Sequence, residues 1–136
     1  MCRIVCSSLL LLVAFGCALP PERLPLQLLP ENSAPLPYSE LLTRARLQAS
    51  AATEAFYLNR WGDLEDSARG LLQTARFFPK ATEVPSTHKT TLGSEASALE
   101  KDAQQLLASA RAQDVKETTS LMQRINLQVR ELRLDK

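Results

Sequence analysis

Residues 94–132 give the strongest indication of the fold, and they read SEASALEKDAQQLLASARAQDVKETTSLMQRINLQVREL. Apolar residues recur there at every third or fourth position, which is the spacing of one face of an α-helix. A polar pair, Gln113 and Asp114, interrupts this spacing and predicts a short turn between two helices. Strong helix formers dominate and no β-branched run alternates, so no strand is expected. Two amphipathic helices with so short a connection are expected to lie antiparallel.

Two more apolar stripes precede this pair of helices. The four stripes consist of Leu42, Ala45, Ala49, Ala52, Phe56 and Asn59; of Leu64, Ala68, Leu71, Ala75 and Phe78; of Leu99, Ala103, Leu106 and Ala110; and of Val115, Thr118, Met122, Ile125, Val129 and Leu132. They predict an all-α fold, an antiparallel four-helix bundle formed by residues 38–136. The many alanines imply close helix approach, so burial of the larger apolar side chains supplies most of the stability.

Caps and breakers predict the boundaries of these helices. Asp63 is suited to cap the second helix, and Pro79 ends it. Gly62 precedes the cap, and the sequence leaves open whether the chain breaks there or only bends. Residues 79–93 show little periodicity and are expected to form a crossover loop, after which Ser94 opens the third helix.

Residues 1–18 have the pattern of an export signal. Arg3 precedes an apolar run from Ile4 to Phe15, and small residues follow that run. The run is too short to span about 30 Å of hydrocarbon at 1.5 Å per residue. The segment therefore predicts a signal peptide and an exported protein, periplasmic or lipid-anchored in a bacterial envelope.

All three cysteines, Cys2, Cys6 and Cys17, lie in this segment, so no disulfide is expected in the folded part. The sequence from Ala14 to Cys17 resembles a bacterial lipobox, in which the cysteine becomes the lipidated first residue of the mature chain. Gly16 fits that pattern, whereas Ala14 and Phe15 depart from it. Cys17 is thus a candidate lipidation site; the alternative is ordinary cleavage after Gly16 or Ala18, which leaves a soluble exported protein.

Residues 19–37 form a proline-rich linker. It holds six of the eight prolines: Pro20, Pro21, Pro25, Pro30, Pro35 and Pro37. Proline fixes φ and removes a backbone donor, so this segment is expected to stay extended. It is predicted to act as a spacer between an anchor and the bundle.

Residues 39–133 resemble the cytochrome c′-like bundle proteins. The resemblance is carried by the second helix from Leu71 to Pro79, by the third from Ala96 to Asp114, and by an arginine near the end of the last helix. Members of that family attach haem on the last helix through Cys-x-x-Cys-His, which an aromatic residue and an arginine follow. The resemblance implies a bundle in which the last helix faces a haem pocket.

The haem-attachment motif itself is absent. When Arg133 is aligned with the family arginine, Ile125 and Gln128 stand at the cysteine positions and Val129 at the histidine position. Haem bound without covalent links needs axial ligands such as histidine and methionine. His88 is expected to be a solvated loop residue and Met122 to fill the core, so no cofactor and no metal site are predicted.

The sequence also lacks the residues that other kinds of catalytic or binding site require. No glycine-rich phosphate loop and no Glu-x-x-His pair occur, and one loop histidine gives little support for hydrolysis. The helical acidic residues mostly lie off the stripes and are expected on a solvated face: Glu54, Asp63, Glu65, Asp66, Glu95, Glu100 and Asp102. With 16 basic and 15 acidic residues, nucleic-acid binding is not expected. The sequence predicts no enzyme.

Trp61 is the aromatic residue that stands out, because it lies at the junction of the first two helices. It is expected to close the end of the core with its indole N–H directed outward. Phe56 and Tyr57 are expected to pack nearby, so that the three rings form an aromatic plug.

Two functions remain. The favoured one is an exported, membrane-tethered bundle with a structural or protein-interaction role, whose partner is an unknown envelope protein or a second copy of the chain. The alternative is a cytochrome c′-like haem or small-ligand carrier in electron transfer. That alternative requires a cavity near Phe56, Met122 and Val129.

Overall fold

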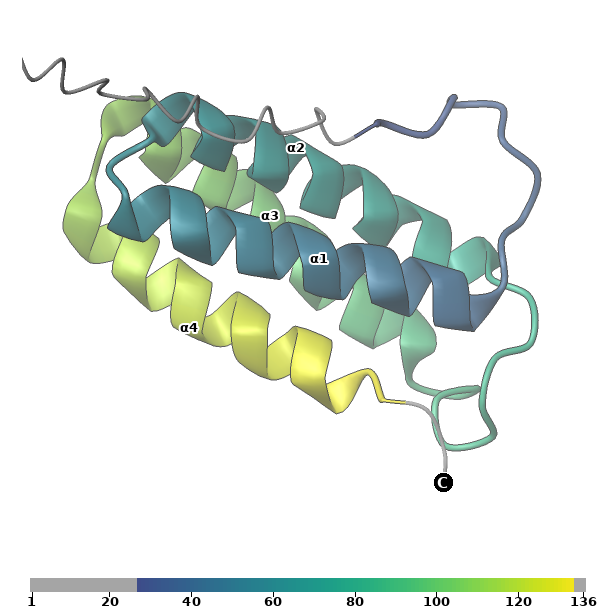
Figure 1. Cartoon of the computed structure of the whole chain (residues 1–136). Coiled ribbons are helices and arrows are strands. Elements are labelled where there is room, and N and C mark those ends of the chain that lie inside the picture. The colour runs from purple at the N-terminus through teal and green to yellow at the C-terminus, as the bar shows by residue number, and fades with distance from the viewer. Residues whose placement is uncertain (1–26, 134–136) are drawn as a thin grey trace, which may run out of the picture.

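The computed structural model describes residues 27–133, and Figure 1 shows four helices that alternate in direction around one core. They are α1 (Tyr38–Tyr57), α2 (Trp61–Phe77), α3 (Leu92–Ala112) and α4 (Val115–Glu131), with a short 3₁₀ helix, η1 (Phe78–Lys80), after α2. Each helix packs on the next, and α4 closes the ring against α1. The predicted all-α four-helix bundle is confirmed. The predicted signal peptide, with Cys17, lies outside the described residues.

The chain breaks between α1 and α2 before it reaches Gly62. Asn59 adopts a left-handed φ of 56°, and its N–H donates to the Phe56 carbonyl while that of Arg60 donates to Ala55. Asparagine tolerates this conformation better than most residues, so the reversal occurs over 58–60. The predicted Asp63 cap is wrong: the helix has already begun at Trp61, and the Asp63 carboxylate pairs with Arg60 at 3.2 Å.

The turn between α3 and α4 lies where the sequence places it. Gln113 is left-handed with a φ of 53°, and the Asp114 carboxylate accepts the Glu117 N–H at 3.0 Å. An acidic N-cap satisfies one of the unpaired donors of the first turn. At its other end α3 begins at Leu92, two residues before the predicted Ser94.

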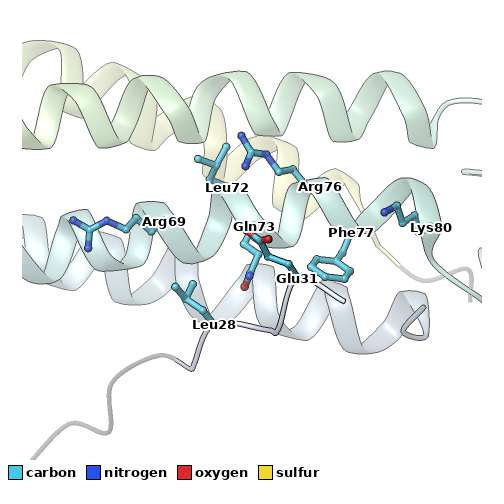
Figure 2. Close-up of a pocket in the computed structure, with 8 residues that line it drawn as sticks. All are labelled: Leu28, Glu31, Arg69, Leu72, Gln73, Arg76, Phe77 and Lys80. Atoms are coloured by element: carbon cyan, nitrogen blue, oxygen red, sulfur yellow. The ribbon is translucent and has the colours of Figure 1, made fainter. Parts of the chain in front are cut away.

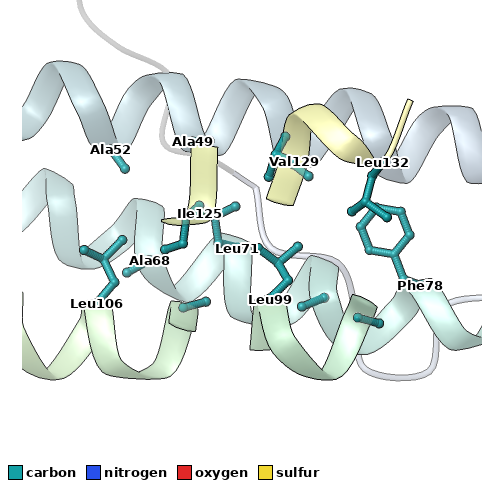
Figure 3. Packing of buried hydrophobic residues seen from close by; sticks show 14 of the residues in the cluster. Ala49, Ala52, Ala68, Leu71, Phe78, Leu99, Leu106, Ile125, Val129 and Leu132 are labelled. Atoms are coloured by element: carbon teal, nitrogen blue, oxygen red, sulfur yellow. The ribbon is translucent and has the colours of Figure 1, made fainter. Parts of the chain in front are cut away.

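The core is a continuous apolar cluster drawn from all four helices, and Figure 3 shows leucines of α2 and α3 facing Ile125 and Val129 of α4. Helix α1 contributes mainly small residues, with Leu41 and Leu42 at its start. Its predicted stripe is wrong at the end, because Asn59 lies beyond the helix and Phe56 is only half-buried. The buried face continues through Ala52 to Ala55, which is three residues further along the same face.

A buried polar contact brings α1 and α2 close together. Gln48 is buried, and its Oε1 accepts a hydrogen bond from Thr74 Oγ1 at 2.8 Å. The Gln48 side chain lies over Gly70, where an added Cβ would stand 2.8 Å from Gln48 Nε2. The glycine therefore makes room for the glutamine, a requirement that the apolar pattern does not reveal.

Residues 27–37, the described part of the proline-rich linker, run along the bundle and are named here the strap. Gln73 on α2 holds the strap through both amide atoms: Oε1 accepts the Leu29 N–H at 2.7 Å, and Nε2 donates to the Leu29 carbonyl at 2.6 Å. Further on, Thr82 pairs in a parallel bridge with Pro37, donating to the Leu36 carbonyl and accepting the Tyr38 N–H. The strap thus enters α1 from a fixed position. Among the described helices, none combines the length and hydropathy that a membrane span requires.

Candidate functional site

The two short turns of the bundle lie at the same end of the molecule (Figure 1). This turn end is defined by Phe56, Tyr57, Leu58, Trp61 and Val115. Trp61 meets Phe56 edge-on at 5.8 Å, and both rings are half-buried. Tyr57 is 80% exposed, Leu58 56% and Val115 58%, so three large apolar side chains face solvent together with part of two rings.

The predicted aromatic plug is therefore wrong for Tyr57. Its ring contacts Phe56 at 5.8 Å but projects away from the core. The physical reason is the α-helical period: Ala55 holds the core position of the last turn, and Tyr57 lies about 200° around the helix from it. Tyrosine and tryptophan at an exposed apolar surface are the residues enriched in protein interfaces.

The opposite end of the bundle, named here the closed end, is formed by Tyr38, Phe78, His88 and Leu132, all of which are buried. The Tyr38 ring meets Phe78 edge-on at 5.6 Å and stacks on His88 at 5.6 Å. Figure 3 shows Leu132 against the Phe78 ring. The largest buried aromatic side chains are therefore at this end and not near Trp61.

His88 is buried, so its predicted position as a solvated loop residue is wrong. Its Nδ1 lies 3.0 Å from Glu95 Oε2, and its Nε2 lies 3.0 Å from the carbonyl oxygen of Arg133. The imidazole thereby joins the loop to the first turn of α3 and to the chain end after α4. The low periodicity of this loop therefore does not reveal that one of its side chains contacts three segments of the chain.

The positions compared with the haem-attachment motif have structural contacts. Ile125 and Val129 are buried in the core, and Gln128 Nε2 donates to Asp102 at 2.9 Å. Met122 is buried as predicted, while both ring nitrogens of His88 already face an acceptor. Within residues 27–133, no group of three or more His, Cys, Asp or Glu side chains gathers as a metal site would require.

Asp102 is buried, which makes the prediction of a solvated face wrong for this residue. Its carboxylate accepts two hydrogen bonds from Arg124, at 3.1 and 2.8 Å, and one from Gln128. The hydrogen bond to Asp102 and the charge of that carboxylate raise the pKa of Arg124. The bidentate pair fastens α3 to α4, and it explains how a carboxylate is accommodated among buried residues.

A groove of about 810 Å³ runs between α1 and α4, which pack less extensively than the other neighbouring helices. Its walls are Arg46, Ala49, Ser50, Thr53 and Glu54 on α1, and Asn126, Val129 and Arg130 on α4. Asn126 Nδ2 bonds to the Met122 carbonyl at 2.9 Å and approaches Thr53 Oγ1 at 3.4 Å. Of the cavity expected near Phe56, Met122 and Val129, only Val129 lines this groove.

A smaller hollow of about 300 Å³ lies under the strap on the outer face of α2 (Figure 2). Leu28 and Glu31 of the strap line one side, and α2 with η1 supplies the other. Two of its cations are already paired: Arg69 with Glu65 and Asp66, and Arg76 with Glu100. The charges of these two arginines are therefore balanced by carboxylates beside the hollow.

Neither protein-family models, nor curated protein sequences, nor solved structures give a match to this chain. The resemblance to the cytochrome c′-like proteins accordingly stays a prediction from the sequence. Four surfaces define what the bundle offers: the turn end, the closed end, the α1–α4 groove and the hollow under the strap. The sequence singles out Phe56, Tyr57 and Trp61 at the turn end but predicts a core plug and not an exposed surface. The α1–α4 groove depends on how the two helices meet in space, and no signal in the sequence identifies it.

Proposed function

We propose that this protein is an exported, membrane-tethered helical bundle with a non-enzymatic role, and that it binds another protein through the turn end. The observation that carries the proposal is the exposure of Tyr57, Leu58 and Val115 around the half-buried rings of Phe56 and Trp61. Leaving this much apolar surface in water is unfavourable, and such patches on stable domains mark interaction sites. Aromatic side chains at their centre supply most binding free energy in protein interfaces.

The tether is supported by the sequence of residues 1–37 and by the way the strap is held. Gln73 on α2 and Thr82 in the loop after η1 hold the strap on the bundle. A force on the preceding chain therefore acts on α2 and on this loop before it acts on the start of α1. The strap is held at Gln73 on α2, twelve residues and about 18 Å along the helix from Trp61 at the turn end, and from there it runs away from that end to α1 (Figure 1). A protein tethered through its strap keeps the turn end accessible to a partner.

The test places a photo-reactive phenylalanine derivative at Tyr57 in the full-length chain inside cells. We expect one dominant cross-linked product after illumination, in the envelope fraction. Gln104, an exposed residue on α3, serves as the matched control and is expected to give none. Equal products from both positions, or none from Tyr57, would remove the support for an interface at the turn end.

The tether is tested separately with a Cys17→Ser variant. Incorporation of a labelled fatty acid into the wild-type chain and its loss in the variant would support lipidation. A chain that is exported and unlabelled would support ordinary signal cleavage instead. The haem-carrier alternative is tested by adding haem to residues 19–136: a Soret shift with stoichiometric binding, weakened by Met122→Ala, would revive it.

A further inference from the structure

The arginines of the bundle fall into two groups. Residues 27–133 contain nine arginines, and six of them have a carboxylate within ion-pair distance: Arg44, Arg60, Arg69, Arg76, Arg111 and Arg124. The three without such a partner in this part of the chain are Arg46, Arg130 and Arg133. Two of these three, Arg46 and Arg130, line the α1–α4 groove from opposite sides.

The groove has one carboxylate, and it does not neutralise this pair. Glu54 lies eight residues beyond Arg46 on α1, about 12 Å further along the helix axis. Its Oε1 is 3.8 Å from the guanidinium of Arg60, which also pairs with Asp63 at 3.2 Å, so Glu54 is directed toward Arg60 and not toward Arg46. The Arg46 end of the groove therefore carries an excess of positive charge in a walled depression. A guanidinium binds carboxylate and phosphate groups through paired N–H donors.

Between the two ends the groove offers hydrogen-bonding side chains over a small apolar floor. Ser50 supplies a hydroxyl and Asn126 an amide oxygen, whereas Thr53 Oγ1 donates to the Ala49 carbonyl and Asn126 Nδ2 is bonded within the bundle. Ala49 and Val129 form the floor. These groups suit a polar molecule that carries hydroxyls next to its anionic group. A volume of about 810 Å³ accommodates a group considerably larger than a simple ion.

Two exposed leucines border the same flank. Leu47 is 61% exposed and lies three residues before Ser50; Leu127 is 49% exposed and lies three residues before Arg130. Residues at this spacing are neighbours on a helix surface, so each leucine stands beside a groove residue. Arginines together with exposed leucines are the combination found where a helix lies at the surface of an anionic bilayer.

We propose that the α1–α4 groove binds the phosphate and glycerol of an anionic phospholipid headgroup, with Arg46 and Arg130 on the phosphate and Leu47 and Leu127 in the bilayer interface. This rests on the proposed function in that a tether brings the bundle to a membrane. The chain from Cys17 to Gln27, ten Cα–Cα steps, reaches at most about 35 Å, which exceeds the width of a four-helix bundle. In this orientation the bundle lies along the bilayer and directs the turn end sideways, toward a neighbouring protein.

The test is sedimentation with vesicles of phosphatidylcholine containing phosphatidylglycerol. It uses residues 19–136 without lipid, because every buried apolar residue of the described bundle lies between Tyr38 and Leu132 and is retained. The double variant Arg46→Gln/Arg130→Gln is expected to bind about 30-fold more weakly, about fivefold for each arginine. Binding of the wild type should fall as salt is added.

The matched control is Arg44→Gln/Arg111→Gln, which removes the same charge from two arginines that already have carboxylate partners. It is expected to keep wild-type affinity. All four side chains are solvent-accessible, and circular dichroism verifies that each variant retains its helix content. A Leu47→Ser/Leu127→Ser variant keeps all the charges but removes the two apolar side chains. It is expected to bind the vesicles more weakly even at low salt, because the contact of the leucines with the bilayer interface is lost.

Two further measurements distinguish a lipid headgroup from a soluble anion. Glycerol phosphate is titrated by calorimetry, and a polyglutamate peptide serves as a soluble acidic polymer. Vesicle binding that depends on Arg46 and Arg130 but not on Arg44 and Arg111 supports the proposal. Absence of vesicle binding, an equal loss in the control, or arginine-dependent binding of only glycerol phosphate or the peptide overturns it. A negative lipidation or cross-linking experiment would count against the proposed function only. It would not change the vesicle-binding result, which is measured on the lipid-free chain.

Discussion

The closed end and the turn end contain similar side chains and expose them to opposite degrees. Tyr38 and Phe78 at the closed end are fully buried, whereas Tyr57 and Leu58 at the turn end face solvent. At the closed end the strap, η1, the loop of residues 81–91 and the end of α4 all converge. At the turn end two connections of two and three residues join the helices, and neither is long enough to fold over the core.

Burial of an aromatic residue in this bundle thus depends on how many chain segments meet around it. A cover of four segments excludes water from Tyr38, Phe78 and His88 together, and buried aromatic rings contribute strongly to stability. A tight turn supplies no such cover. Stability is therefore expected to concentrate at the closed end and interaction at the turn end, and the following changes test that division.

The largest effect is expected from Phe78→Ala. Its ring is fully buried between Tyr38 and Leu132, so truncation should lower the free energy of unfolding by about 3–5 kcal/mol. Urea denaturation followed by circular dichroism measures the change. Tyr57→Ala is the matched control and should change the value by less than about 0.5 kcal/mol. Similar losses in both variants would contradict the division between the two ends.

A smaller loss is expected from His88→Ala. The substitution leaves the half-buried carboxylate of Glu95 and the carbonyl of Arg133 without their shared partner, at a cost of about 1–3 kcal/mol. Hydrogen exchange should rise in the last turn of α4 and in the loop but not at the turn end. His88→Gln, which keeps one amide donor, should recover part of the protection. Uniform exchange over the whole bundle would show that the ring is not a local clamp.

At the turn end, stability is expected to be most sensitive to the backbone conformation of Asn59. Asn59 has a left-handed φ of 56°, so Asn59→Ala should cost about 1 kcal/mol because a Cβ without a local polar group disfavours that region. Asn59→Gly should be as stable as the wild type or more so, since glycine adopts positive φ freely. Thermal unfolding of the three proteins gives the order. An alanine variant as stable as the glycine variant would contradict it.

The smallest effect on stability is expected from Tyr57→Ser combined with Leu58→Ser. Both side chains are exposed, so the free energy of unfolding should change by less than about 0.5 kcal/mol. The same double variant should abolish cross-linking from a photo-reactive group placed at Val115, the third exposed residue of this surface. Loss of stability with retained cross-linking would reverse the roles assigned to the two ends.

Much of the bundle could be predicted from the sequence because helix period and turn chemistry are local properties. The stripes from Leu64 to Phe78 and from Leu99 to Ala110 fall on buried faces, and Gln113 and Asp114 form the expected turn. The start of α2 was missed because a left-handed Asn59 ends α1 and allows the next helix to begin at Trp61, before the Asp63 cap. The sequence pattern does not indicate which polar residue adopts positive φ.

The errors about polar side chains have a common cause. His88 and Asp102 were expected in solvent because isolated polar residues off an apolar stripe usually are. Each is buried because a partner from a distant segment satisfies it: Arg133 lies 45 residues from His88, and Arg124 lies 22 residues from Asp102. Such pairs form only when the helices have assembled, so the spacing of residues along the sequence does not indicate them.

The helices, their order and most of their apolar faces follow from the sequence alone, since residue period and propensity act over a few turns of chain. The packing of the helices in three dimensions sets which end of the bundle is covered and which carboxylates are neutralised. It also places Arg46 and Arg130, which have no carboxylate partner within residues 27–133, on opposite sides of a groove. Those properties depend on distances between segments that are far apart in the chain. They are also the properties from which an interaction surface and a headgroup site are inferred.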